Sequence, residues 1–290
     1  MTVISTLSRR RFLGASVAIG GTCVLLNGAS PDQPMGAKVP TAGAASPPLP
    51  PPPPTPLELK LAALAVAEGA DFLGCGDMTG AYALAERVSG KALPANSPRL
   101  PRVISIGVRL SEELVDSLPR NMGGYSQHFY STMWPKAKVI ARKLGDCLKA
   151  DGHRVLYGLS GLDGLPKMAA RLSGLGWIGK SCLLVTPEVG PRAAWEAVLT
   201  DAPIRPTTAK PMERQCGDCR RCQDICPAKA IPGTDFAEDQ PLAARFKAEL
   251  CEKHRQSFGN IFTDGACGLC LKVCPFGCGQ DLLVASSEVP

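Results

Sequence analysis

Nine of the 13 cysteines in this chain of 290 residues lie between Cys216 and Cys278, so a short region holds most of the sulfur. Its first run, Cys216-x2-Cys219-x2-Cys222-x3-Cys226-Pro227, has the spacing found in bacterial ferredoxins. In such a run three thiolates on a tight loop bind one 4Fe-4S cubane, and the fourth reaches a second cubane. The spacing therefore predicts two 4Fe-4S clusters and one-electron chemistry.

A second run, Cys267-x2-Cys270-x3-Cys274-Pro275, has the same ending but carries Asp264 in place of its first cysteine. By the two-cluster rule, the ligands predicted for the first cluster are Cys216, Cys219, Cys222 and Cys274. Those predicted for the second are Cys226, Cys267, Cys270 and one further residue. Cys251, Cys278 and Asp264 are the candidates for it, and a carboxylate is a hard donor that suits a cluster poorly. Cys251 and Cys278 remain.

Zinc is the alternative metal, because paired Cys-x2-Cys units are also typical of zinc ribbons that merely brace a fold. Zinc takes four thiolates per site. Here an overlapping run that ends in Cys-Pro occurs twice, which favours cubanes over zinc. Disulfides fit least well, because spacings of two residues would be unusual for them.

The N-terminus resembles a twin-arginine export signal, in which Ser8-Arg9-Arg10-Arg11-Phe12-Leu13-Gly14 leads into a weakly hydrophobic stretch over residues 15–26. That stretch is shorter than the roughly 20 residues needed to span a bilayer. We therefore expect a signal peptide over residues 1–30. Residues 31–56 are rich in Pro, Ala, Gly and Ser and are expected to form a linker.

Export by this route carries a chemical implication, because it moves proteins that are already folded and loaded with clusters. The expected location is the periplasm or the outer face of the cytoplasmic membrane. The expected partners are the export machinery and a redox partner protein or membrane electron donor. No nucleic acid is expected, because the positive residues behind the net charge of +6 are dispersed and aromatic residues make up only 5% of the chain.

Between the linker and the cysteines, helical and strand patterns alternate. Helices are predicted over residues 57–70, 81–88, 114–118, 136–150 and 165–172. Strands are predicted over residues 70–75, 102–108, 153–159, 182–186 and 193–199. The predicted fold class is α/β, with a layered α/β domain over residues 57–204 and a C-terminal two-cluster ferredoxin-like domain over residues 205–290.

The segment from Lys167 to Lys180, with Gly174-Leu175-Gly176-Trp177-Ile178-Gly179-Lys180 at its end, resembles the epoxyqueuosine reductase and reductive dehalogenase superfamily. The resemblance continues in Leu199-Thr200-Asp201-Ala202-Pro203. It implies a corrinoid-binding α/β domain whose cobalamin receives electrons from the clusters. It also implies that a distant upstream cysteine, Cys251, completes the second cluster. The corrinoid-contact candidates it suggests are Gly174, Gly176, Trp177, Gly179 and Lys180.

The chain departs from the family pattern at the active site. The position of the proton-donating Asp of epoxyqueuosine reductases is held by Ser160, with Asp163 nearby. Tyr125, His128 and Tyr130 are weak candidates for the Tyr donor and basic residue expected of a dehalogenase. Export also argues against a transfer-RNA substrate. Two functions remain: a corrinoid-dependent reductase, and a non-catalytic two-cluster electron-transfer protein without a corrinoid.

Overall fold

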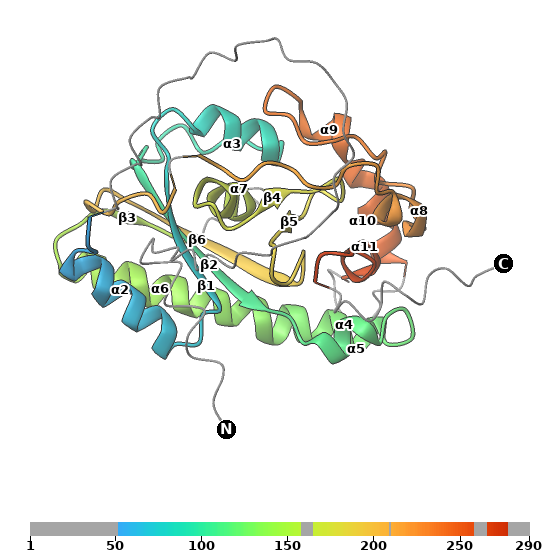
Figure 1. Cartoon of the computed structure of the whole chain (residues 1–290), viewed down its shortest axis with the longest axis horizontal. Helices are drawn as coiled ribbons and strands as arrows, with labels where there is room; N and C mark the ends of the chain where they lie inside the picture. The colour runs from blue at the N-terminus through green and yellow to red at the C-terminus, as the bar shows by residue number, and fades with distance from the viewer. Residues whose placement is uncertain (1–51, 158–164, 209, 258–265, 278–290) are drawn as a thin grey trace, which may run out of the picture.

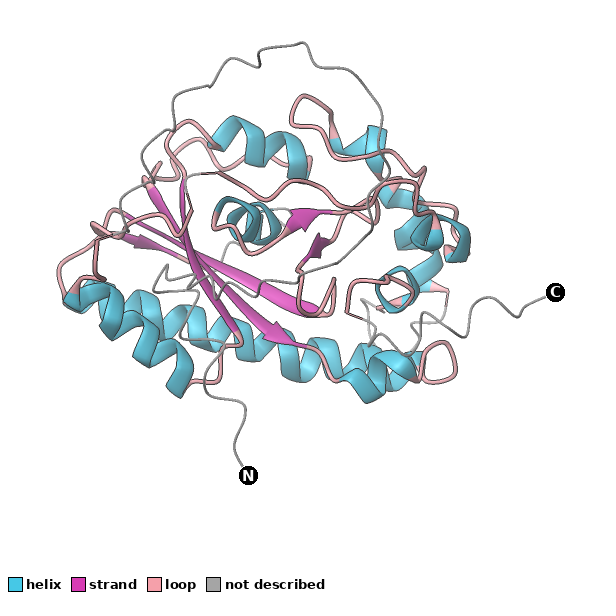
Figure 2. Ribbon diagram, in the orientation of Figure 1, coloured by secondary structure: helices cyan, strands magenta, loops and turns pink. Residues whose placement is uncertain are grey.

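A computed structural model describes residues 52–157, 165–208, 210–257 and 266–277 of the chain. At its centre is an antiparallel sheet in the order β1-β2-β6-β3. These strands are β1 (Phe72–Asp77), β2 (Arg102–Arg109), β6 (Ala193–Thr200) and β3 (Val155–Leu156). Helices cover both faces (Figures 1 and 2), so β6 is buried along its whole length and β2 is buried at all but its two end residues.

On one face of the sheet, α2 (Pro56–Ala67) packs beside α6 (Trp134–Ala150). A capping box between Thr55 and Glu58 starts α2, because each residue's side chain accepts a hydrogen bond from the other's backbone N–H. The buried stripe of α6, which includes Ile140 and Leu144, packs in one hydrophobic core with Ile104 of β2.

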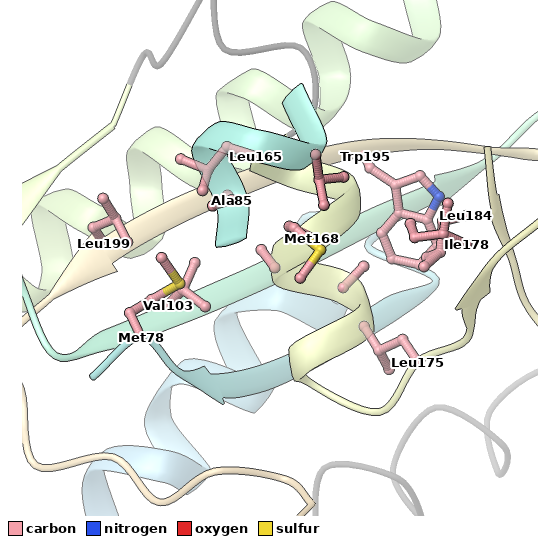
Figure 3. Close-up of a cluster of buried hydrophobic side chains, with 14 of the residues drawn as sticks. Met78, Ala85, Val103, Leu165, Met168, Leu175, Ile178, Leu184, Trp195 and Leu199 are labelled. Atoms are coloured by element: carbon pink, nitrogen blue, oxygen red, sulfur yellow. The ribbon is translucent and has the colours of Figure 1, made fainter. Parts of the chain in front are cut away.

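On the other face lie α3 (Tyr82–Ser89), α7 (Leu165–Leu172) and a hairpin of β4 (Trp177–Ile178) and β5 (Leu184–Val185). Figure 3 shows Met168 of α7 in the middle of this layer, with Trp195 and Ile178 toward one side and Val103 toward the other. This second core fixes the hairpin against the sheet, and the hairpin in turn reaches the cysteine-rich region.

The remaining helices gather at one end of the sheet. A chain of α4 (Glu112–Asp116), α5 (Met122–His128) and the π-helix η1 (Phe129–Met133) leads into α6. Beyond it lie α8 (Arg221–Ile225), α9 (Leu242–Arg245), α10 (Ala248–Gln256) and α11 (Leu269–Lys272) (Figure 1).

The predicted α/β fold class is confirmed, and most elements fall where the hydrophobic patterns place them. The strand predicted over residues 182–186 shrinks to β5, because Cys182 has a positive φ of 57° and lies in a turn. The strand predicted over residues 153–159 reduces to β3 among the described residues. β4 was not predicted, since it falls inside the Gly-rich segment.

At the N-terminal end of the described chain, Arg205 fixes the start of α2. Its guanidinium bonds to the carboxylate of Glu58 at 2.5 Å and donates to the carbonyl oxygens of Pro52 and Pro53. The predicted signal peptide and most of the predicted linker lie outside the described residues. Within the described ranges, no helix has both the length and the apolarity to cross a membrane.

Candidate iron–sulfur centre

The first cysteine run forms a tight loop that leads into α8. The N–H of Cys219 donates to the carbonyl oxygen of Cys216 at 3.0 Å, and Gly217 between them adopts a positive φ of 47°. Cys226 ends α8 and is buried, and its sulfur accepts a hydrogen bond from the N–H of Ala230 at 3.4 Å. The spacing thus gives the compact loop expected of a ferredoxin run.

Cys274 of the second run lies beside the first loop. Burial raises the pKa of Cys274 to about 12, with further increases from the charges of Cys216, Cys222 and Cys219. Burial also raises the pKa of Cys222 to about 11, again with contributions from Cys216 and Cys219. Because a like charge raises a pKa only from nearby, these four sulfurs form one group. They are the four residues predicted for the first cluster.

A second group of thiols forms around Cys270. Burial raises its pKa, and the charges of Cys267, Cys251, Cys222 and Cys226 raise it further. The pKa of Cys251 is likewise raised, first by burial and also by Cys226 and Cys267. Cys251, which the family resemblance indicated, therefore lies with the other three thiols predicted for the second cluster.

The two groups are close neighbours. Cys222 of the first group acts on the pKa of Cys270 in the second, and α8 packs against α11. The alternative ligands Cys278 and Asp264 lie outside the described residues, so the assignment of Cys251 stays a prediction. Adjacent cubanes would need this arrangement, because electrons must pass between them over a short distance.

Zinc and a cubane place different demands on their thiolate ligands. Within the described part of the chain, no three His, Cys, Asp or Glu side chains converge closely enough to hold a single metal ion. A tetrahedral zinc needs all its ligands within about 2.3 Å of one atom. A cubane instead binds each thiolate to a different iron, so its ligands stand farther apart.

The β4–β5 hairpin holds the first cysteine loop in place. Lys180 Nζ donates to the carbonyl oxygen of Gly217 at 2.6 Å and to that of Cys219 at 3.4 Å. Gly179 lies so close to the first cysteine loop that a Cβ at this position would be 3.6 Å from the sulfur of Cys216. The loop that carries three predicted ligands is therefore bound to the α/β layer through backbone carbonyls.

The same hairpin also holds the second cysteine run. Trp177 packs its ring edge-on against Phe276, two residues after Cys274, with the ring centroids 4.8 Å apart. A Cβ on Gly190 would meet the carbonyl oxygen of Phe276 at 1.6 Å, so only glycine fits this approach. The hairpin thus contacts both segments that supply the first group of thiols.

The five corrinoid-contact candidates are all engaged within the protein. A Cβ on Gly174 would meet the side chain of Thr208 at 2.6 Å, and one on Gly176 would meet the carbonyl oxygen of Val185 at 2.2 Å. Gly179 and Lys180 face the first cysteine loop, and Trp177 is buried on Phe276. These residues brace the hairpin and the loop, and they do not form an open cradle for a corrinoid.

Three of the catalytic candidates lie along α5 and η1, and Tyr125 is close to the second group of thiols. Tyr125 is buried against Gly268, where a Cβ would meet its ring at 2.6 Å. Burial raises the pKa of Tyr125, and among the charges that raise it further the effect of Cys270 is the largest. Tyr130 Oη accepts a hydrogen bond from Arg255 Nη1 at 3.4 Å.

His128 is the third of these candidates, and its Nε2 is buried with no hydrogen-bond partner among the described residues. Asp163 and Ser160 lie outside the described residues. Catalytic roles stay predictions for the four candidates Tyr125, His128, Tyr130 and Asp163.

Contacts between the second run and the α4–α5 region were not predicted. Lys272 Nζ donates to the carbonyl oxygens of Asp116 and Leu118. Arg192 is 4% exposed, pairs with Asp116 at 3.0 Å and donates to the carbonyl oxygen of Lys272. No local pattern marks these residues, because each contact joins segments far apart in the sequence.

Comparison with known proteins agrees with this geometry. Residues 215–277 match the 4Fe-4S double cluster binding domain family. An epoxyqueuosine reductase of Bacillus cereus is 38% identical over 112 residues, which are 38% of this chain and 28% of that protein. One from Cellulophaga algicola is 34% identical over 154 residues, 52% of this chain and 49% of that protein.

The chain is a relative of the epoxyqueuosine reductases. It spans half or less of the length of these two relatives. A reductive dehalogenase solved with 3-bromo-4-hydroxybenzoic acid superposes with a TM-score of 0.61 at 22% identity, covering 80% of this chain and 34% of that one. Epoxyqueuosine reductase from Bacillus subtilis superposes with a TM-score of 0.51 at 22% identity, covering 77% of this chain and 66% of that one. These two likenesses show a shared fold, and the resemblance read from the sequence is confirmed.

Proposed function

We propose that this epoxyqueuosine reductase relative is an iron–sulfur oxidoreductase in which two 4Fe-4S clusters relay electrons. The observation that carries the proposal is the division of eight thiols into two adjacent groups, one around Cys274 and one around Cys270. The clusters would supply one-electron transfer. The protein supplies the spacing, because the hairpin and α4 hold the two cysteine runs against each other.

The acceptor in this proposal is a corrinoid. One structural neighbour, a reductive dehalogenase with a TM-score of 0.60, is described in terms of B12-dependent dehalogenation. A bound corrinoid would supply the reactive cobalt. The five residues suggested for its contact do not fit that role in this structure, so no corrinoid contact is derived from them.

The second candidate is an electron-transfer protein that keeps the fold without a corrinoid. Two observations favour it: the engaged Gly-rich segment and Ser160 at the position of the family's proton-donating Asp. Both candidates include export by the twin-arginine route. Both also include electron supply from a redox partner protein or a membrane donor.

Metal analysis separates the candidates. Anaerobically purified protein is incubated with excess cobalamin and desalted, and its iron, acid-labile sulfide, cobalt and zinc are quantified beside an EPR spectrum of the reduced sample. About eight iron atoms per chain would mark two cubanes. Stoichiometric cobalt with this iron supports the reductase, and its absence supports the electron carrier. Zinc without sulfide would contradict both.

A further inference from the structure

Arg255 lies on α10 one turn after Cys251, the cysteine predicted to complete the second cluster. Residues four apart on a helix share one face, so these two side chains are neighbours. The side chain of Arg255 is 26% exposed, and Cys251 is also partly buried. A positive charge is therefore held beside the second group of thiols, where water screens it only in part.

Two contacts fix the guanidinium of Arg255 in this place. Its Nη1 donates to Tyr130 Oη at 3.4 Å, which joins α10 to η1. Its Nη2 donates to the carboxylate of Glu252 on the same helix. Because the two contacts come from different elements, the side chain is anchored from both sides and cannot swing freely into solvent.

Glu252 does not cancel the charge of Arg255 at the thiol. Burial is the largest influence on the pKa of Cys251 and raises it. Among the charges, Arg255 has the largest effect and lowers this pKa, whereas Glu252 has the smallest and raises it. The side chain of Glu252 is 43% exposed, so water screens its carboxylate more strongly. The pair therefore acts on Cys251 as a net positive charge.

The first group of thiols has a different electrostatic setting. Burial raises the pKa of Cys222 most, and the charges that raise it further are those of Cys216 and Cys219, which are themselves thiols. The strongest charge acting on Cys251 is thus positive, and the strongest acting on Cys222 is negative. The two adjacent groups are unequal in a property that governs reduction.

A cubane with thiolate ligands is an anion, and its reduction adds one further negative charge. A nearby positive charge stabilises the reduced form more than the oxidised form and so raises the reduction potential. We propose that Arg255, held by Tyr130 and Glu252, raises the reduction potential of the second cluster.

This role deepens the electron relay proposed above and rests on it. The second cluster takes one electron from the redox partner or membrane donor, and no bond is formed or broken in the step. With Arg255 in place, the electron is accepted more readily at this cluster than it would be without the charge.

The test is a potentiometric titration of the full-length, cluster-loaded protein, followed by EPR. Two one-electron steps are expected, and the step that is missing in Cys251→Ser belongs to the second cluster. In Arg255→Gln, the ratio of reduced to oxidised second cluster at a fixed potential should fall about tenfold, a shift of about 59 mV for one electron. The other step should stay in place.

Lys253→Gln is the matched control. It removes one positive charge from the same helix, but Lys253 is exposed and lies two residues from Cys251, on another face of α10. This variant should titrate as the unmodified protein does.

Two further variants of Arg255 separate charge from packing. Arg255→Lys keeps the charge and should retain most of the potential. Arg255→Met removes the charge and keeps a long apolar side chain, so it should shift the second step as Arg255→Gln does. It also decides the matter if Arg255→Gln does not take up its clusters.

Four outcomes would overturn the proposal. They are an unmoved second step in the charge-removing variants, an equal fall in Arg255→Lys, an equal fall in Lys253→Gln, and both steps persisting in Cys251→Ser. Iron content separates these outcomes from a failure of the relay. About eight iron atoms with an unmoved step would refute the role of Arg255 alone, whereas protein without clusters would refute the relay itself.

Discussion

Lys180 Nζ lies 2.6 Å from the carbonyl oxygen of Gly217, so a side chain of the β4–β5 hairpin is hydrogen-bonded to the backbone of the first cysteine loop. A second, longer bond reaches the carbonyl oxygen of Cys219. The charged ammonium makes these bonds stronger than neutral ones. The loop is thereby held in place by the α/β layer.

Replacing Lys180 should weaken the first cluster. In Lys180→Gln the amide is too short to reach both carbonyls, so we expect the iron content after brief exposure to air to fall from about eight toward about four atoms per chain. Lys180→Arg keeps the charge and the length and should retain most of the iron. The measurement is the content of iron and acid-labile sulfide, together with an EPR spectrum of the reduced protein. Equal iron loss in both variants would show that the bonds from Lys180 to the loop do not protect the first cluster.

The fourth ligand of the second cluster can be identified by paired substitutions. Cys251→Ser should lose that cluster and leave about four iron atoms per chain, because Cys251 lies with Cys226, Cys267 and Cys270. Cys278→Ser should keep both clusters. Reconstituted iron and the EPR spectrum provide the comparison, and the reverse pattern would assign the ligand to Cys278.

Glu58 should make stability depend on pH in acid. The hydrogen bond from Arg205 lowers the pKa of Glu58 from 4.5 to about 2. Its stabilising contribution is complete above pH 4.5, where the unfolded carboxyl is ionised, and is lost as the pH falls toward 2. Glu58→Gln should cost about 2 kcal/mol of unfolding free energy at neutral pH.

Urea unfolding of the apoprotein, followed by circular dichroism, measures this effect. The difference between wild type and Glu58→Gln should shrink as the pH is lowered from 4.5. A constant difference at all pH values would mean that the pair with Arg205 does not stabilise the fold.

Gly176 and Gly123 should respond oppositely to alanine. A Cβ on Gly176 would meet the carbonyl oxygen of Val185 at 2.2 Å, so Gly176→Ala should destabilise by about 2 kcal/mol or more. Gly123 lies in α5 with open space at its Cβ position, and Gly123→Ala should stabilise by about 0.5 kcal/mol. Urea denaturation gives both values, and a neutral Gly176→Ala would refute the close approach of β4 and β5.

The cysteine spacing alone predicted the first thiol group and three members of the second, because consecutive ligands are local and the crossing of Cys226 and Cys274 follows from a repeated pattern. The spacing did not select Cys251, which only the family resemblance indicated. Hydrophobic periodicity likewise placed the long helices and the strands β1, β2 and β6. In both cases the information lies within a short window of sequence.

The hairpin's role could not be predicted in this way. Lys180 and Gly217 lie 37 residues apart, and Glu58 and Arg205 lie 147 residues apart. For the Gly-rich segment, the family resemblance pointed to a corrinoid. Only the folded chain brings Gly179 to the sulfur of Cys216.

The contacts of the hairpin with both cysteine runs bear on the order in which the protein matures. In a small ferredoxin, metal binding can itself drive folding. Here Trp177, Gly190 and Lys180 hold the two runs through contacts that involve no cluster. We therefore expect the α/β layer to form before the first four thiols are presented together. Cluster delivery would then be a late step of biogenesis, and a defect in the hairpin would appear as a failure of iron loading.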